Sequence, residues 1–234
     1  MKIKKLPTIL LWCLYATVCV SQPIEPANYK KYSGACLSST KYYGPGAFAF
    51  DVKASKVQGT IFCAFLTDFE MKAAEEPAAH VELGFELIGQ KIEVIKCVAV
   101  LGGGRHLIKD IPLGFDASEA FHNYKIVQKT NAVEWWVDGK IVYTLGPEEA
   151  RVFLKPMRLY LNFRPAVSHC DDEWGCIRKA TLPTDAQVMQ FGYTAGLSTQ
   201  SKLNPGDDTF ELSHEDRFAK YDAELWQFAA RGSN

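Results

Sequence analysis

Two glutamates that stand four residues apart, Glu82 and Glu86, are the residues of this sequence best suited to acid–base chemistry. They lie in the stretch AHVELGFELIGQ (79–90), where hydrophobic residues alternate with them. Because successive residues of a β-strand point to opposite faces, the two carboxyl groups would share one face, with Gly84 between them. Burying two carboxylates side by side is costly unless something pairs with them. The pattern therefore indicates a working pair of acids, a remnant of one, or the solvated face of an ordinary strand.

The elements that would position these glutamates are predominantly β-strands. Segments rich in β-branched and aromatic residues recur between turn-forming residues, at 47–54, 57–67, 80–89, 91–101, 124–129, 132–145, 157–163 and 186–194. Asp138–Gly139, inside 132–145, is a strong hairpin signal. The GGGR segment at 102–105 lacks the Lys-Ser/Thr of a phosphate loop and is predicted to be a glycine turn. Many short strands without alternating helices predict an all-β fold, a two-sheet antiparallel β-sandwich of the jelly-roll type.

The two ends of the sequence differ from this β-rich middle. Residues 1–21 have a basic start and an apolar run from Leu6 to Val20, the pattern of a signal peptide cut near Ser21; a retained anchor is the alternative. We therefore expect a secreted protein, extracellular or in a cell wall, with no membrane span after cleavage. Residues 22–195 would form the β-domain.

Residues 196–234 are predicted to be a linker followed by an amphipathic C-terminal helix over about 214–230. Apolar residues there fall at helical spacing, namely Phe218, Tyr221, Leu225, Trp226 and Ala229. A helix of this kind would pack back on the sandwich or bind a partner.

Charge and cysteine content narrow the classes of partner. The net charge is −1, and losing the three lysines of residues 1–21 would take it to −4, so no nucleic-acid partner is expected.

Cys170 and Cys176 are predicted to form a disulfide, with zinc binding together with His169 as the alternative. Cys63 and Cys97 lie in apolar runs and are expected to be buried thiols or a second bridge. We expect a monomer without cofactor or metal.

Several motifs occur together in an order typical of one enzyme family. They are YYGPGAFAFDVKAS, GTIFCAFL, VELGFELIG, LGFDASEAFHNY, AVEWWVDGKIVYTL and PMRLYLNFRP. Over roughly residues 38–194 the sequence resembles glycoside hydrolase family 16, which includes β-glucanases, xyloglucan transglycosylases and fungal wall-crosslinking enzymes. The resemblance implies a concanavalin-like jelly roll with a sugar-binding cleft and a β-glucan-like polysaccharide as partner.

In that family the catalytic strand reads E-x-D-x-E. The resemblance implies that Glu82 is the nucleophile and Glu86 the general acid/base, while Gly84 stands where the family has aspartate. A retaining glycosidase needs its carboxyl groups about 5–5.5 Å apart, whereas four strand residues span roughly 13 Å between Cα atoms. Strand curvature and the long side chains must close that gap. The space above Gly84 is expected to be open.

Some residues remain available to contact a sugar. The expected substrate-binding residues are Trp135, Trp136 and Trp174, whose rings could stack on a sugar, together with His122 and Asn162. Trp135 and Trp136 would point to opposite faces, so one of them is expected in the core.

Other family positions are altered. Ala49 and Asp51 replace Glu and Arg, Cys97 replaces Asn, Val127–Gln128 replace Glu-Trp, and Arg164 replaces Trp. Two functions remain open: a secreted retaining β-glycan hydrolase or transglycosylase, and a catalytically weak or inactive carbohydrate-binding or cell-wall protein on the same fold.

Overall fold

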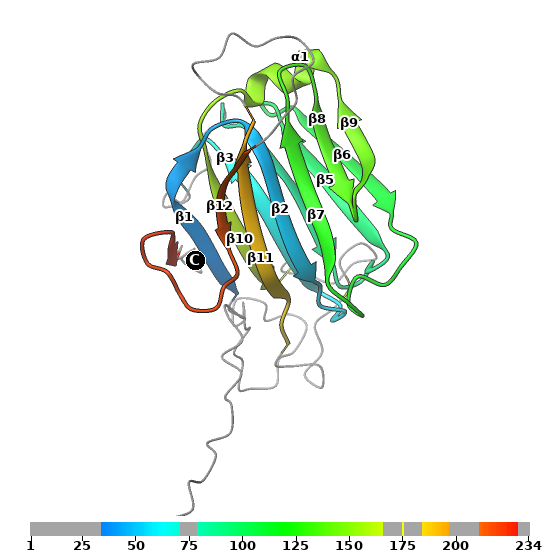
Figure 1. The fold of residues 1–234 in the computed structure, drawn as a ribbon. Coiled ribbons are helices and arrows are strands. Elements are labelled where there is room, and N and C mark those ends of the chain that lie inside the picture. The colour runs from blue at the N-terminus through cyan, green and yellow to red at the C-terminus, as the bar shows by residue number, and fades with distance from the viewer. Residues whose placement is uncertain (1–33, 71–78, 166–174, 176–183, 197–210, 229–234) are drawn as a thin grey trace, which may run out of the picture.

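Two antiparallel β-sheets packed face to face make up the fold (Figure 1). The computed structural model describes residues 34–70, 79–165, 175, 184–196 and 211–228. The seven-stranded sheet has the order β13-β1-β10-β3-β4-β5-β6 and the six-stranded sheet the order β12-β11-β2-β7-β8-β9. The predicted all-β jelly-roll sandwich is confirmed.

The strands of the seven-stranded sheet are β1 (Ala35–Tyr43), β3 (Thr60–Thr67), β4 (Glu82–Ile88), β5 (Val94–Val100), β6 (His106–Pro112), β10 (Met157–Pro165) and β13 (Trp226–Phe228). Those of the six-stranded sheet are β2 (Gly46–Lys53), β7 (His122–Gln128), β8 (Val133–Val137), β9 (Lys140–Leu145), β11 (Gln187–Ala195) and β12 (Glu211–Asp216). In the described residues the helical elements are a short α1 (Pro147–Ala150) and the 3₁₀ turn η2 (Arg151–Phe153).

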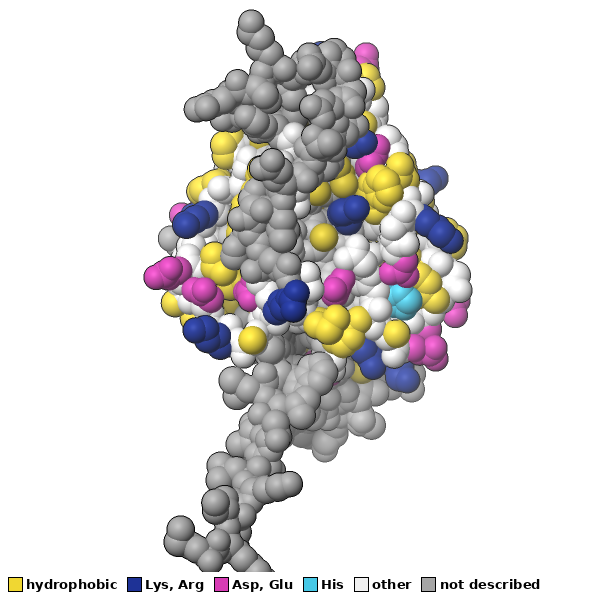
Figure 2. Space-filling model, viewed as in Figure 1, with side chains coloured by type: hydrophobic (Ala, Val, Ile, Leu, Met, Phe, Trp, Pro, Cys, Tyr) yellow, Lys and Arg dark blue, Asp and Glu magenta, His cyan; other side chains and the backbone are white. Residues whose placement is uncertain are grey.

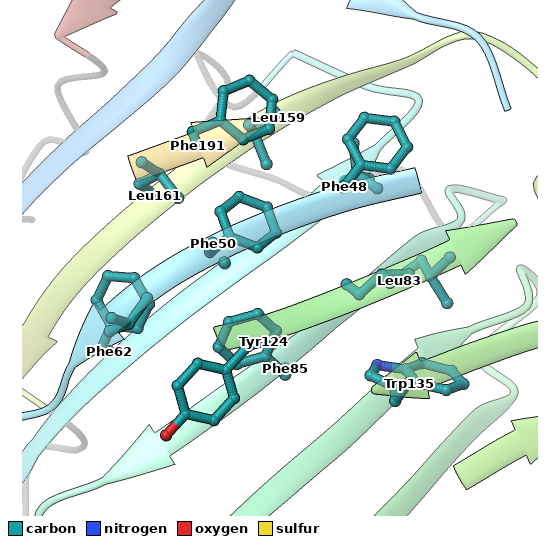
Figure 3. Close-up of a cluster of buried hydrophobic side chains, with 14 of the residues drawn as sticks. Phe48, Phe50, Phe62, Leu83, Phe85, Tyr124, Trp135, Leu159, Leu161 and Phe191 are labelled. Atoms are coloured by element: carbon teal, nitrogen blue, oxygen red, sulfur yellow. The ribbon is translucent and has the colours of Figure 1, made fainter. Parts of the chain in front are cut away.

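The core lies between the two sheets and is built from alternate residues of each strand. Phe50 of β2 stacks on Phe191 of β11, and Phe85 of β4 stacks on Tyr124 of β7, at centroid distances of 5.4 and 5.2 Å (Figure 3). All four side chains are almost completely buried. Burying a side chain of this size stabilises the fold by roughly 1.5–3 kcal/mol, and the Phe85–Tyr124 pair joins the two sheets directly.

The turns agree with the sequence signals. Asp138 and Gly139 both have positive φ, 47° and 78°, and join β8 to β9 as the predicted hairpin turn. The glycines at 102–104 also have positive φ and form the turn between β5 and β6, closed by the bond from the Arg105 amide to the Gly102 carbonyl. The segment is a glycine turn, as predicted.

The predicted C-terminal helix over 214–230 is wrong for the residues described there. Residues 211–228 form β12 on one sheet and β13 on the other; β12 pairs with β11 and β13 with β1, so that each is the outermost strand at one edge of its sheet. Phe218 and Trp226 are buried, and Asp216 accepts hydrogen bonds from the Trp226 indole N–H and the Phe218 amide at 2.6 and 2.7 Å. We call residues 216–226, which cross from one sheet to the other, the C-terminal crossing.

Tertiary packing therefore overrides the helical spacing of the apolar residues in this segment. Among the described residues, no helix has the length and apolar character needed to cross a membrane.

Candidate active site

Strand β4 presents Glu82 and Glu86 on the outer face of the seven-stranded sheet, and both residues are half-buried. The alternating residues Leu83, Phe85 and Leu87 are buried in the core on the other face. The predicted strand geometry is thus correct, because the two glutamates share a face with Gly84 between them. The site is best described as three cross-strand rows that run through these three residues.

The Glu86 row is polar at both ends. Glu86 is paired with Cys63 of β3 on one side and with Lys96 of β5 on the other, and Cys63 is paired in turn with Asn162 of β10. The Lys96 ammonium lies 3.1 Å from a carboxylate oxygen of Asp110 on β6. Lys96 is 7% exposed and Asn162 5% exposed, so this row holds polar groups in a largely water-excluded setting.

The Gly84 row is apolar. Gly84 is paired with Phe65 of β3 and Val98 of β5, and Phe65 is paired with Tyr160 of β10. The rings of Phe65 and Tyr160 stack at 5.2 Å with an interplanar angle of 10°. Together with Ile61, Cys63 and Ile88, they form a second hydrophobic cluster on the outer face, separate from the main core.

The expectation of open space above Gly84 is wrong. A β-carbon added to Gly84 would lie 2.5 Å from Cβ of Phe65 and 2.8 Å from the carbonyl oxygen of Ala64. Real Cβ atoms essentially never come this close to other heavy atoms. The neighbouring strand β3 therefore occupies the position in which the side chain of the family's aspartate would begin.

The Glu82 row lies at the other end of the site. Glu82 is paired with Thr67 of β3 and Val100 of β5, and Val100 is paired with His106 of β6. His80, which precedes β4, makes an edge contact with the ring of Phe69 at 4.8 Å. Imidazole side chains thus lie beside the proposed nucleophile.

The three rows enclose a hollow of about 170 Å³. Its lining comes from β3, β4, β5, β6 and β10 and from His80, two residues before β4. It consists of Cys63, Phe65, His80, Glu82, Gly84, Phe85, Glu86, Val98, Val100, His106, Asn162 and Arg164. Both glutamates therefore face one concave space, with carboxylates at its ends and an apolar strip between them.

Glu86 has a direct contact inside this hollow. The Cys63 thiol donates to Oε1 of Glu86 at 3.7 Å. Burial raises the pKa of Cys63 well above its ordinary value of 9.0, and the negative charge of Glu86 raises it further. Cys63 is therefore a neutral S–H donor to the carboxylate rather than a nucleophile.

The start of β4 is fixed by Asp68, which follows β3. Its carboxylate accepts a bond from the Val81 amide at 2.9 Å and one from the Lys155 ammonium at 2.9 Å. Burial raises the pKa of Asp68, but these two contacts outweigh it and hold the pKa below its ordinary value of 3.8. The residue directly before Glu82 is thus tied to the neighbouring strand.

Of the predicted substrate-binding residues, the structure brings Asn162 to the glutamates and places Trp135, Trp136 and His122 elsewhere. Trp135 lies in the core, 1% exposed, where its indole N–H donates to the Gly84 carbonyl at 2.8 Å (Figure 3). Trp174 lies outside the described residues, as do Cys170 and Cys176 and therefore both the predicted disulfide and the zinc alternative with His169.

Trp136 and His122 lie on the six-stranded sheet, not beside the glutamates. The Lys125 ammonium lies 4.6 Å from the centre of the Trp136 ring, and Nδ1 of His122 lies 2.7 Å from Asp138. Figure 2 shows the molecule from the side of this sheet, where acidic, basic and hydrophobic side chains are interspersed. Sequence alternation assigned the two tryptophans to opposite faces correctly, but it could not say which sheet they would join.

The altered family positions also divide between the sheets. Arg164 lines the hollow, whereas Ala49, Asp51, Val127 and Gln128 belong to β2 and β7 of the six-stranded sheet.

Cys97 is fully buried in the main core, opposite Phe85. The alternative of a Cys63–Cys97 bridge is wrong, because both are free thiols and they lie on opposite faces of the seven-stranded sheet.

Sequence reasoning missed several residues of the hollow. Cys63, Phe65 and Val98 were recognised only as parts of apolar runs, and His106 was not singled out; nor was Lys96, which is paired with Glu86 but does not line the hollow. The signal that could have found Cys63 and Phe65 is the two-residue period of β3, which is buried on both faces. In the part of the chain that is described, no group of three or more His, Cys, Asp or Glu residues could hold a metal ion.

A family model for glycosyl hydrolases family 16 matches residues 21–176. The chain belongs to this family. Curated relatives include a beta-glucanase of Brevibacillus brevis, 26% identical over 145 residues, which are 61% of this chain and 53% of that protein. A beta-glucanase of Paenibacillus polymyxa is 30% identical over 120 residues, covering 51% of this chain and 48% of that protein. The family 16 chain thus spans about half the length of these relatives.

Solved structures of the family share the fold. A Bacillus licheniformis beta-glucanase superposes with a TM-score of 0.60 at 22% identity, covering 73% of this chain and 75% of that one. The Crh5 transglycosylase superposes with a TM-score of 0.52 at 21% identity, covering 73% and 74%. At these identities the likeness concerns the architecture.

Proposed function

We propose that this family 16 protein is a retaining β-glycan hydrolase or transglycosylase, with Glu82 as nucleophile and Glu86 as general acid/base. The observation that supports it is the position of both carboxylates on one strand, facing one hollow, inside the region matched by the family model. The curated relatives named as beta-glucanases make a β-glucan the first substrate class to test.

The proposed reaction has two steps. In the first, a carboxylate oxygen of Glu82 attacks the anomeric carbon, the glycosidic bond breaks, and Glu86 gives its proton to the departing oxygen. In the second, Glu86 takes a proton from an incoming hydroxyl group, whose oxygen displaces Glu82 from the anomeric carbon. Water as the acceptor gives hydrolysis, and a sugar hydroxyl gives transglycosylation.

The rest of the hollow suits a neutral sugar. The apolar strip formed by Phe65 and Val98 offers a surface for the C–H face of a pyranose ring. The Asn162 amide and the Arg164 guanidinium, both on β10, supply donors for hydroxyl groups. Carboxylates at both ends of the strip would then flank a bound ring.

A second candidate is a carbohydrate-binding protein without turnover. It is favoured by Gly84, which brings no carboxylate to assist Glu82, and by Phe65, whose β-carbon fills the start of that side chain's path. On this reading the hollow would bind a glycan while the pair of glutamates contributes only polar contacts.

The deciding experiment is an activity screen of the whole protein against β-1,3-, β-1,4- and mixed-linked glucans and chitin oligomers. Reducing-end release reports hydrolysis, and mass spectrometry of labelled oligosaccharides reports transfer. Glu82→Gln and Glu86→Gln should each abolish turnover, whereas the exposed Glu93→Gln should leave it unchanged. Binding of a glucan by a wild type that turns over none of these glycans would support the second candidate and overturn the first.

The proposal includes export and a monomeric state. The basic and apolar pattern of residues 1–21 supports export, and cleavage near Ser21 would be tested by N-terminal sequencing of the protein recovered from the medium. Light scattering of the purified protein tests the monomer.

A further inference from the structure

We infer that Cys63 is a positioning residue for Glu86: its thiol holds and hydrogen-bonds the carboxylate of the proposed acid/base. This inference rests on the proposed function for its catalytic meaning. The contact itself is a structural claim and can be tested without turnover.

The thiol of Cys63 is shielded from solvent and lies beside the carboxylate of Glu86. Cys63 is directly opposite Glu86 in the cross-strand pairing of β3 and β4, and its Sγ lies 3.7 Å from Oε1 of Glu86. The residue is 5% exposed and lines the hollow. Side chains directly opposite each other on an antiparallel pair are the closest cross-strand neighbours. The thiol is therefore held against the carboxylate by the sheet itself.

The protonation state of Cys63 suits a donor. Burial, together with the charge of Glu86, keeps the pKa of the thiol far above neutral pH, so the sulfur retains its proton through the range in which the enzyme would work. A thiol is a weak donor and not a competing base. Cys63 can therefore orient Glu86 without exchanging a proton with it.

Other charged groups also face Glu86, and the test must separate them from Cys63. Glu82 lies on the same strand, Lys96 is opposite Glu86 on β5 with Asp110 behind it, and Arg164 approaches from β10. His80 and His106 lie at the Glu82 end of the hollow. Replacing Cys63 leaves all of these groups in place, so a Cys63 variant isolates the hydrogen bond.

The chain offers a matched control in Cys97. Both cysteines are buried in one sheet, on the two strands that flank β4, but Cys97 faces the core beside Phe85 instead of the hollow. Cys97→Ala removes the same atoms as Cys63→Ala and creates a comparable cavity. Cys63→Ser provides the second comparison, because its hydroxyl keeps a donor at the same place.

The first measurement is the infrared S–H stretching band of the whole protein, assigned from wild type minus Cys63→Ala and wild type minus Cys97→Ala difference spectra. We expect the Cys63 band at lower frequency than the Cys97 band, because hydrogen bonding to a carboxylate weakens the S–H bond. In Glu86→Gln the Cys63 band should move to higher frequency and the Cys97 band should stay. If the frequency of the Cys63 band is the same in Glu86→Gln as in wild type, the inference is overturned, whether or not the protein is active.

The second measurement is the pH profile of kcat/KM on whichever glycan the screen identifies. A donor to the ionised carboxylate stabilises that form, so Cys63→Ala should move the alkaline limb to higher pH by a few tenths to about one pH unit. The same variant should lower kcat roughly 2- to 10-fold with little change in KM. Cys63→Ser should restore most of the wild-type profile, and Cys97→Ala should lower stability without moving the limb.

The two failures are distinguishable. Wild-type protein inert on every glycan defeats the proposed function, and the infrared response then still decides the contact between Cys63 and Glu86. An active enzyme whose pH profile is the same in wild type, Cys63→Ala and Cys63→Ser defeats the positioning role and leaves the proposed function standing.

Discussion

The β-carbon of Phe65 lies 2.5 Å from the place that a β-carbon on Gly84 would take. Directly opposite residues on an antiparallel pair normally keep their Cβ atoms about 4.5–5.5 Å apart. Strand β3 has therefore closed over the point at which the family's aspartate would branch from β4. The loss of the aspartate therefore involves the position of β3 as well as the residue at position 84 of β4.

Gly84→Ala is expected to destabilise the fold by about 1–3 kcal/mol, because the added methyl group meets Phe65 and the Ala64 carbonyl oxygen. Gly84→Asp should be at least as destabilising and should not improve catalysis. Urea unfolding measures both. Gly44→Ala is the control, since its added carbon would meet only the Tyr193 hydroxyl at 3.7 Å. Equal stability of Gly84→Ala and wild type would contradict the closure of β3.

Trp135→Phe is expected to cost about 1–3 kcal/mol, because it leaves the buried Gly84 carbonyl without the indole N–H. Trp136→Phe should cost less, since its half-buried indole donates to Glu134 on the outer face of the same six-stranded sheet. Thermal unfolding of the two variants makes the comparison. A larger loss for Trp136→Phe would overturn the assignment of Trp135 as the tryptophan that joins the sheets.

Asn162→Ala is expected to weaken glycan turnover about tenfold or more, because its amide lies in the hollow with both glutamates. His122→Ala should leave turnover near the wild-type value, since this imidazole stacks on Phe115 and pairs with Asp138 on the other sheet. Steady-state kinetics on one glucan tests the pair. The reverse order of effects would mean that the substrate occupies a different face.

Asp68→Asn is expected to lower stability by about 1 kcal/mol at neutral pH, because the negative charge that strengthens the bonds from Lys155 and the Val81 amide is lost. The folded-state pKa of Asp68 lies below its ordinary value of 3.8, so its contribution is fully present above pH 3.8 and is lost as pH falls through the folded pKa. Urea midpoints of variant and wild type should therefore converge in acid. Lys155→Met leaves the Val81 bond intact, so it should show a smaller loss of stability with the same dependence on pH. A difference between the urea midpoints of Asp68→Asn and wild type that stays constant into strong acid would contradict the dependence of stability on Asp68 ionisation.

Asp216→Ala is expected to destabilise the protein by about 1–3 kcal/mol, because it removes the acceptor for the buried Trp226 indole and the Phe218 amide. Near-ultraviolet circular dichroism should report the loosened tryptophan. Asp222→Ala is the comparison, since the Asp222 side chain accepts a hydrogen bond from the exposed Glu224 amide at 2.9 Å. Similar losses for both variants would argue against a structural role specific to Asp216.

Local alternation was enough to predict most strands and the shared face of Glu82 and Glu86. It works because one face of each strand is buried, and a one-residue slip would expose the whole hydrophobic set. It missed β6, an edge strand with exposed residues on both faces, and β1, whose polar Ser and Thr residues hide its pattern. Edge strands carry weak hydrophobic signals because only part of their surface is covered.

The site was predicted only in part, because residue spacing gives the face of a strand but not its sheet. Glu82, Glu86 and Asn162 meet because β4 and β10 belong to the same sheet, whereas the strand carrying Trp136 joins the other. Trp226 shows a second limit. Its spacing from Phe218 fits a helix, but burial between the sheets and the bond to Asp216 favour an extended crossing.

The C-terminal crossing has a consequence for biosynthesis. The strands that cover β1 and β11, namely β13 and β12, are the last parts of the described chain to be synthesised. Until β12 has emerged from the ribosome, β11 offers unpaired amide and carbonyl groups to any neighbouring chain, and β1 does so until β13 has emerged. A nascent chain stalled near Ala195 would hold every other strand and both glutamates, and yet remain prone to aggregation at two open edges. The two sheets therefore reach their full width only after residues 211–228 have been synthesised.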